Sequence, residues 1–200
     1  MERLAYIIAD FFIRKKLIPD DQREVCRYGY EVILSTIVGK ILVFSISMAM
    51  GKLDAGIVFL LVFCVARRYC GGYHADTYLR CNAMLVLVVV AYFGLIQVLE
   101  ISSTTGFIID VVIYLLFMAC VVSYAPLDNV NKQLTERQQK KYRFISLILG
   151  LVFGIAAAIL YICRCEYAIM IIVALFIVTI LMVIQVKRRD KDECNTEFNG

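Results

Sequence analysis

The chain of 200 residues has no tryptophan, only two prolines and a single histidine. Without a second histidine, a metal site would depend on cysteines and carboxylates, and these show no regular ligand spacing. Without tryptophan, the aromatic residues at a membrane interface have to be tyrosines. No phosphate-binding loop or dinucleotide fingerprint is present, so no nucleotide-driven chemistry is indicated. The sequence therefore predicts neither a cofactor nor a bound metal.

Apolar residues are present in large excess. They make up 62% of the chain, and the mean hydropathy is +0.79, whereas a water-soluble domain has roughly 45–50%. Several stretches approach the roughly 20 apolar residues that cross a ~30 Å hydrocarbon core. Backbone polar groups in lipid have to be satisfied within a segment, so these stretches are helices. The sequence predicts an all-α, polytopic integral membrane protein that forms one domain over residues 1–200.

We expect about six transmembrane helices, which together form a bundle over residues 32–186. The second of them is short at its apolar core, which favours a half-buried or tilted helix that starts near Lys52. Residues 187–200 are polar and are expected to form a cytoplasmic tail. The six predicted spans are Val32–Met50, Ala55–Ala66, Ala83–Leu99, Phe107–Tyr124, Phe144–Cys163 and Tyr167–Val186.

Residues 1–31 precede the first span and are expected to form interfacial or cytoplasmic helices. In "MERLAYIIADFFIRKK", apolar residues recur at helical spacing and charged residues occupy the rest of the helix surface. This pattern predicts an amphipathic helix that lies in the membrane interface. Asp10 interrupts the apolar run and no small-residue cleavage site follows, so the stretch is not a cleavable signal. A second helix, which leads into the first span, is expected after Pro19.

Basic residues indicate the orientation. With both termini in the cytoplasm, all of the 21 Lys and Arg residues but three fall on the cytoplasmic side. The three exceptions are Lys52 and Arg164 on the opposite side and Lys40 within the first span. This bias follows the positive-inside rule. It places the polar segment at residues 67–81 on the cytoplasmic face.

That segment, "RRYCGGYHADTYLRC", contains two cysteines on either side of the only histidine. Cys81 directly precedes an apolar run, which places it near a helix N-terminus, where the partial positive charge favours a thiolate. Arg80 adds to this effect. Cys70 lies at the end of the preceding helix, where the dipole opposes a thiolate. Cys81 is therefore the preferred nucleophile.

His74 is the candidate general base. On one continuous helix it would stand about 10 Å from Cys81, too far for proton transfer. Gly71-Gly72 permits the chain to fold back, so that a loop-borne imidazole reaches the sulfur. Asp76 is a candidate for orienting the imidazole.

Two other interpretations of the segment stay open. Cys70, His74 and Cys81 are three candidate metal ligands, although their spacing is irregular and a fourth ligand is missing. Alternatively, His74 is a structural residue that donates a hydrogen bond to a backbone carbonyl.

The segment resembles the signature of the accessory gene regulator B family, the membrane-embedded cysteine peptidases of Gram-positive quorum sensing. The shared residues are Arg67, Gly71-Gly72, His74 and Cys81. A second stretch, "APLDNVNKQLTERQQKKYR", is similar to the family's lysine-rich loop. It has Pro126, Asn131 and Lys132 at the matching places, but Gln133 where many members have proline.

The resemblance implies a cysteine endopeptidase that cleaves the C-terminal part from a precursor peptide of the accessory gene regulator D type. Cleavage would pass through a thioester, and the remainder would close into a cyclic autoinducing peptide. Cys81 would be the nucleophile and His74 the base, and the supporting residues would be Arg67, Gly72, Pro126 and Lys132. An arginine at the end of a span is also a common ligand of lipid phosphate.

The resemblance also implies a multi-pass protein of the bacterial cell membrane. The expected partners are the precursor peptide and membrane lipids, with no nucleic acid, and a homo-oligomer is left open. Lys132, Lys140, Lys141 and Arg143 would bind the precursor's acidic tail, although the positive-inside bias alone accounts for basic residues there.

Two other functions remain alternatives. One is a six-span transporter of a peptide or ion, in which Asp110 of the fourth span would take part, and the other is an adaptor that only binds the peptide.

Overall fold

The computed structural model describes residues 2–15, 19, 22–71, 78–100, 105–127 and 135–198. Within these ranges the chain forms helices and no strands, so the predicted all-α class is confirmed. The helices are α1 (Glu2–Arg14), α2 (Arg23–Ala49), α3 (Leu53–Cys70), α4 (Tyr78–Glu100), α5 (Thr105–Tyr124), α6 (Glu136–Ile162) and α7 (Tyr167–Phe198).

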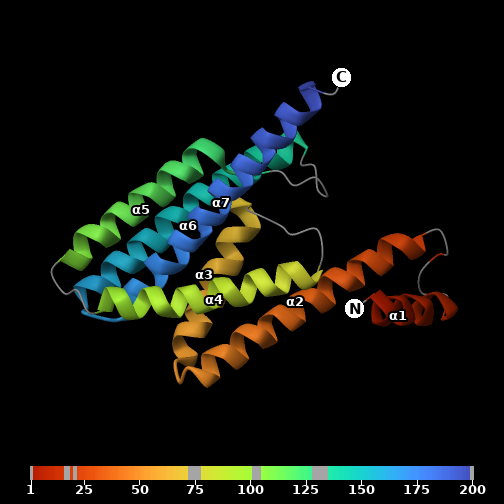
Figure 1. The fold of residues 1–200 in the computed structure, drawn as a ribbon, viewed down its shortest axis with the longest axis horizontal. Helices are drawn as coiled ribbons and strands as arrows, with labels where there is room; N and C mark the ends of the chain where they lie inside the picture. Colours follow the sequence, from red (N-terminus) through yellow and green to blue (C-terminus); the bar gives the residue numbers. More distant parts are fainter. Residues whose placement is uncertain are drawn as a thin grey trace.

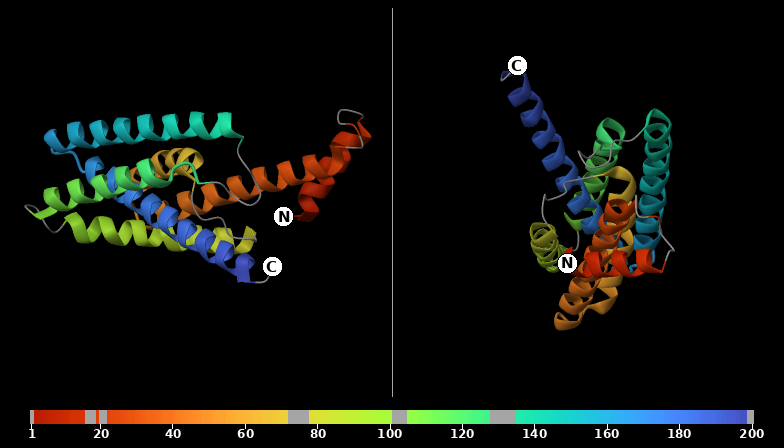
Figure 2. Two further views of the ribbon diagram at one scale, coloured as in Figure 1. Left: turned by 90° about the horizontal axis from the view of Figure 1, so that it is seen from above. Right: turned by 90° about the vertical axis from the view of Figure 1, so that its right-hand side faces the viewer.

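Five helices of the described chain, α2, α4, α5, α6 and α7, are long and apolar enough to cross a membrane. They correspond to five of the six predicted spans, and the protein is therefore a multi-pass membrane protein. The remaining one, α3, has only 18 residues and includes Asp54, Arg67 and Arg68. It begins directly after Lys52, as predicted. It also runs across the long axis of the molecule, whereas the five longer helices run broadly along it (Figures 1 and 2).

The polar end of the chain differs from the prediction. The tail expected from residue 187 is not a separate segment, because α7 continues as a helix to Phe198. The extension begins with "KRRDK", and the lysines and arginines in it are good helix formers.

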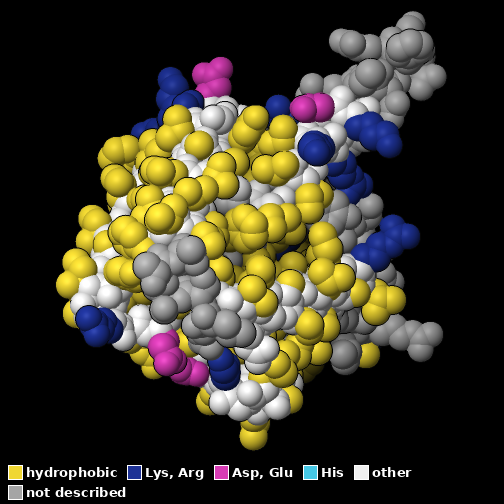
Figure 3. Space-filling view, turned by 60° about the vertical axis from the view of Figure 1, so that its left-hand side comes forward, with side chains coloured by type: hydrophobic (Ala, Val, Ile, Leu, Met, Phe, Trp, Pro, Cys, Tyr) yellow, Lys and Arg dark blue, Asp and Glu magenta, His cyan; other side chains and the backbone are white. Residues whose placement is uncertain are grey.

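The core is centred on α7, which packs against α3, α4, α5 and α6. Its spanning segment is 72% buried, compared with 17–28% for the other four candidate spans. This segment is apolar on every side, which is the pattern of a helix enclosed by others. The outer helices instead leave large apolar side chains uncovered, such as Ile41 and Phe44 on α2 and Ile155 on α6. Apolar surface dominates the view in Figure 3, with the charged side chains mostly at its margins.

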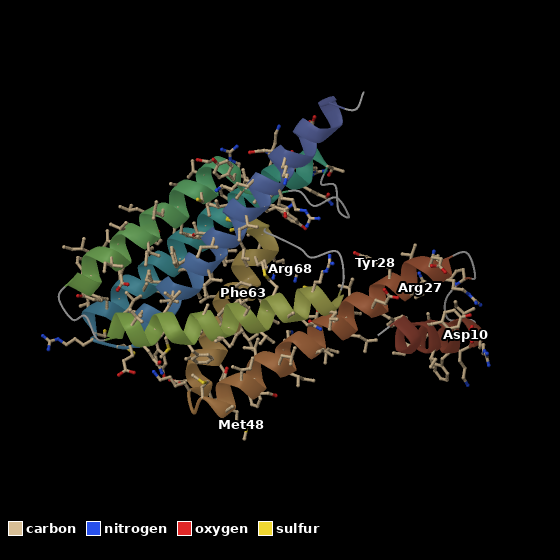
Figure 4. All side chains as sticks on the ribbon, in the orientation of Figure 1. Asp10, Arg27, Tyr28, Met48, Phe63 and Arg68 are labelled. Atoms are coloured by element: carbon tan, nitrogen blue, oxygen red, sulfur yellow. The ribbon has the colours of Figure 1, made fainter. Side chains whose placement is uncertain are left out.

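Contacts among α2, α3 and α4 determine where α4 lies. The hydroxyl of Tyr92 on α4 donates to the carbonyl of Ala55 on α3 at 3.1 Å. The Tyr92 ring also lies 4.8 Å from that of Phe59. The Phe59 ring in turn stacks on Phe63 at 4.7 Å, near the place where α3 passes α4 (Figure 4). On the other side, Gly39 of α2 lies against Leu85 of α4.

The N-terminal helix α1 is amphipathic, as predicted. Ala5, Ala9 and Ile13 are buried, and α1 packs on α2. Ile7 and Phe11 on the other face are exposed. The location of this exposed face in the membrane interface stays a prediction.

The helix ends divide between the two ends of the molecule. The last turns of α3 and α5 and the first turns of α4 and α6 lie toward the same end as the two termini (Figures 1 and 2). The last turns of α4 and α6 and the first turns of α5 and α7 lie at the opposite end. This arrangement agrees with termini on one side of the membrane, and the assignment of that side to the cytoplasm stays a prediction.

Candidate active site

Cys81 lies in the first turn of α4, as the sequence predicts. Its side chain is partly exposed and forms no disulfide. Backbone N–H groups of a first helical turn have no partner within the helix and carry partial positive charge. Cys81 therefore has the two properties that a nucleophilic thiol needs, which are access to a substrate and surroundings that favour negative charge.

Arg67 lies in the last turn of α3, beyond the apolar stretch 55–66. Its guanidinium is 5.4 Å from the centre of the Phe63 ring. Burial lowers the pKa of Arg67 below its ordinary value, and negative charge on Cys81 and Cys64 acts in the opposite direction. Arg67 and Cys81, on two different helices, are thus near enough to interact electrostatically. Because the guanidinium stays protonated at neutral pH, it supplies positive charge beside the candidate nucleophile.

Cys70 has opposite properties, although it is only 11 positions away. It is fully buried at the end of α3. Burial raises the pKa of the Cys70 thiol to about 11, and a side-chain hydrogen bond with Ser146 of α6 acts against this rise. Cys70 is therefore a protonated structural thiol at neutral pH, which supports the choice of Cys81 as nucleophile.

This difference predicts how Cys70 responds to alkylation. At pH 8, iodoacetamide should alkylate Cys70 about 100-fold more slowly in the folded protein than in the denatured chain. The reason is that folding raises the pKa of the Cys70 thiol from 9.0 to about 11, and only the thiolate reacts. The protonated thiol is the form that folding favours. Its contribution to stability is therefore complete below pH 9 and is lost as the pH rises toward 11. Mass spectrometry of Cys70 peptides after timed iodoacetamide exposure measures the rates, and equal rates in both states would contradict the prediction.

The two polar segments found in the sequence meet in the structure. Leu127, three residues after the end of α5, donates its backbone N–H to the carbonyl of Cys70 at 3.1 Å. Leu127 is buried and lies directly against Gly71. The preceding Ala125–Pro126 peptide bond is cis. Pro126 thus belongs to the segment that contacts the end of α3.

The first turns of α6 are attached to the same region. The ring of Tyr142 meets that of Tyr69 edge-on at 5.6 Å. Arg143 donates to the carbonyl of Val122 at 3.0 Å. Lys140 and Lys141 are exposed on the neighbouring surface. The helix begins with a capping box, in which the N–H of Thr135 donates to the side chain of Gln138. A basic helical surface therefore adjoins the end of α3.

Gly72, His74, Asp76 and Lys132 lie outside the described residues. The roles predicted for them, and the alternative metal site that would use His74, stay predictions. Within the part of the chain that the structure describes, no three His, Cys, Asp or Glu side chains form a group able to hold a metal ion.

Asp110 lies apart from this region. It is buried near the beginning of α5, and α5 begins at the end of the molecule opposite to the beginning of α4 (Figure 1). Its Oδ1 has no hydrogen-bond partner among the described residues. The structure therefore does not join Asp110 to the candidate active site.

Sequence reasoning missed Leu127 and Ser146. Leu127 follows Pro126 in the second polar segment, but nothing in that segment indicates that it contacts α3. Ser146 is a single hydroxyl in an apolar helix, and such a residue most often bonds its own backbone. It does so here, with Tyr142 at 2.8 Å, in addition to its contact with Cys70.

The described helices form a bundle, and several of them are long and apolar enough to cross a membrane. A partly exposed thiol lies at a helix N-terminus with an arginine beside it. These features define a multi-pass membrane protein with a candidate thiol site. The chain belongs to the accessory gene regulator B (AgrB) family, whose model matches residues 5–186. This membership supports a role in accessory gene regulator peptide processing.

Two relatives come from Clostridium perfringens. A protein classed as AgrB-like, from strain SM101 / Type A, is 23% identical over 151 residues, which cover 74% of this chain and 71% of that protein. A second AgrB-like protein, from strain 13 / Type A, is 22% identical with the same coverage. No solved structure matches the chain.

Proposed function

We propose that this protein is a cysteine endopeptidase of the bacterial cell membrane. It cleaves the C-terminal part from a precursor of the accessory gene regulator D type and promotes closure of the remainder into a cyclic autoinducing peptide. The observation that carries the proposal is the contrast between the two thiols of one motif. Cys81 is partly exposed at a helix N-terminus beside Arg67, whereas Cys70 is buried and protonated. Only the first has the surroundings of a nucleophile.

The reaction has two acyl-transfer steps. His74 takes the proton from Cys81, and the Sγ thiolate attacks a carbonyl carbon of the precursor. The C–N bond breaks, His74 protonates the leaving amine, and the N-terminal part stays attached to Cys81 as a thioester. A thiol or hydroxyl of the bound peptide then gives its proton to His74 and attacks the thioester carbonyl carbon. The ring closes as the bond from that carbon to the sulfur of Cys81 breaks, and the released thiolate takes the proton back from His74.

Ring closure has to be faster than hydrolysis of the thioester. A nucleophile within the bound peptide has a large effective molarity, because it is held near the carbonyl. Cys81 is only partly exposed and leads directly into the apolar part of α4. Limited access of water at this place suppresses the hydrolytic side reaction. The thioester conserves much of the free energy of the cleaved bond, so no nucleotide is needed for the second step.

Purified protein in liposomes, supplied with the precursor and analysed by mass spectrometry, tests the proposal. A peptidase gives a free C-terminal fragment and a mass adduct on the peptide that contains Cys81. Intact precursor inside the liposomes, without cleavage, would indicate a transporter. Binding with neither cleavage nor transport would indicate an adaptor. Either of these results would refute the peptidase.

The basic surface near α6 is expected to bind the acidic tail of the precursor. Changing Lys132, Lys140, Lys141 and Arg143 together to glutamine should raise KM about tenfold at low salt, because several exposed charge pairs of modest strength are lost. The difference from wild type should shrink as salt rises. Cleavage rates measured over a salt series check this. An unchanged KM and an unchanged salt dependence would mean that these residues only set the membrane topology.

A further inference from the structure

Lys40 is a basic residue within the apolar part of α2. The stretch from Val32 to Ala49 contains no other charged residue, and an ionisable residue at this depth of a membrane helix is costly and often functional. The side chain of Lys40 is exposed. Within the part of the chain that the structure describes, no carboxylate forms an ion pair with it. The ammonium thus has no counter-charge among these residues.

Lys40 lies on the face of α2 that packs against α3. Two turns further along this face, the side chain of Ser47 lies against Gly56 of α3. The short turn at residues 50–52 reverses the chain, so that α3 leads from Gly56 back toward the level of Lys40. There Lys40 acts electrostatically on Cys64 of α3, whose side chain is exposed. The ammonium therefore lies near an accessible thiol of α3.

Two further observations place Lys40 near the candidate nucleophile. Arg67, in the last turn of α3, acts electrostatically on the same cysteine as Lys40 and is also near enough to Cys81 to interact with it. On the other side, α2 and α4 pack together and run in the same direction (Figure 1), and Gly39 lies against Leu85. Leu85 follows Cys81 by four residues, which is about 6 Å of helix rise. Lys40 thus lies about one helical turn further along the bundle than Cys81.

We propose that Lys40 binds a carboxylate of the precursor peptide that lies within about three residues of the scissile bond. This inference rests on the proposed function, which places the scissile carbonyl at Cys81. An extended peptide advances about 3.3 Å per residue, so two or three residues cover the distance from Cys81 to the level of Lys40. A bound carboxylate supplies the counter-charge that the ammonium lacks, and the pair is less costly at this depth than either charge alone. Lys40 is thus a specificity-determining residue that selects acidic peptides, whereas Arg67 acts on the nucleophile.

The kinetic test compares Lys40→Met with Lys40→Arg in the full-length protein in liposomes. Lys40→Met keeps an unbranched side chain but removes the charge. It should raise KM for cleavage about tenfold and keep kcat within about threefold of wild type, because a charged hydrogen bond to the substrate is lost. Lys40→Arg keeps the charge and should recover most of the affinity.

Two kinetic results would overturn the proposal. A lower kcat with an unchanged KM would mean that Lys40 acts on the reacting atoms and not on the bound substrate. Wild-type values of both constants in Lys40→Met would mean that the ammonium only extends to the phosphates of the lipid headgroups.

Amide substitutions in a synthetic precursor identify the carboxylate. Each Asp or Glu within three residues of the scissile bond is changed in turn to Asn or Gln. One of these changes should raise KM about tenfold with the wild-type protein and have no further effect with Lys40→Met, because the same pair is already broken. An amide placed further along the acidic tail is the matched control and should change KM equally with both proteins. Additive effects at every position near the scissile bond would refute the pairing.

Protection of Cys64 measures binding without cleavage. The experiment uses Cys81→Ala, which retains the proposed carboxylate site but has no nucleophile, and N-ethylmaleimide as the alkylating reagent. Precursor at about ten times its Kd should slow alkylation of Cys64 about tenfold, because about nine-tenths of the sites are then occupied. Cys163 is also exposed but follows the far end of α6, so its rate should not change. Mass spectrometry of the two peptides gives both rates, and adding Lys40→Met should weaken the protection.

The carboxylate site and the peptidase fail in different ways. If the wild-type protein cleaves the precursor, but Lys40→Met leaves KM unchanged and Cys64 is not protected, the carboxylate site is refuted and the peptidase stands. If the precursor protects Cys64 only when Lys40 is present, but the wild-type protein does not cleave it, the peptidase is refuted and the carboxylate site stands.

Discussion

Replacing Cys81 by alanine is expected to reduce precursor cleavage below detection, while replacing Cys70 by alanine should leave most of it. The acyl-enzyme cannot form without the Cys81 sulfur, and removing a covalent nucleophile commonly costs several powers of ten in kcat. Cys70 lies at the other end of the same motif but is buried, with a pKa near 11. Its thiol packs against the bundle and bonds Ser146, so its loss affects mainly stability.

The measurement is the yield of C-terminal fragment from precursor in liposomes, with thermal unfolding as a check on the fold. Cys70→Ala is the matched control, because both variants remove one sulfur from the same motif. Cys70→Ala should lower the unfolding temperature by a few degrees, since it removes a fully buried sulfur and leaves Ser146 with only its backbone bond. If Cys81→Ala still cleaves the precursor, Cys81 is excluded as the nucleophile, whether or not Cys70→Ala keeps its activity.

Much of the fold follows from the hydropathy pattern. The requirement that backbone groups in lipid bond within their own segment turns each long apolar stretch into a helix. The direction of α3 does not follow from that requirement. Hydropathy shows that its apolar part is short, but its path across the molecule depends on contacts such as those of Ala55 and Phe59 with Tyr92. The continuation of α7 beyond Val186 was also not predicted, because polarity marks the end of a membrane span and not the end of a helix.

The candidate site was predictable where chemistry depends on helix ends. The different positions of Cys70 and Cys81 relative to two helix termini were sufficient to distinguish a structural thiol from a candidate nucleophile. Leu127 and Ser146 were not predictable, because each contacts Cys70 from a part of the chain more than 50 residues away. The Gly71-Gly72 pair did indicate a change of direction after α3, but not the segment that Gly71 lies against.

Removing the charge of Arg67 is expected to have the second-largest effect on the reaction. Two opposite unit charges about 8 Å apart attract each other by about 2 kcal/mol at an effective dielectric constant near 20, and Arg67 is near enough to Cys81 to interact with it electrostatically. Arg67→Gln should therefore lower kcat/KM by about 10- to 100-fold at neutral pH. Alkylation of Cys81 by iodoacetamide at neutral pH should slow as well, because it depends on the same negative charge on the sulfur.

Arg67→Lys is the matched variant, because it keeps the charge but lacks the planar group that lies over the Phe63 ring. It should recover most of the rate of Cys81 alkylation at neutral pH and only part of kcat/KM, because an ammonium on a flexible stem holds its charge less precisely. An arginine that only bound lipid phosphate would give another result. Arg67→Gln would then reduce membrane insertion or thermal stability and leave the rate of Cys81 alkylation at neutral pH unchanged. That result would remove Arg67 from the reaction and leave the helix N-terminus of α4, together with His74, as the source of thiolate stabilisation.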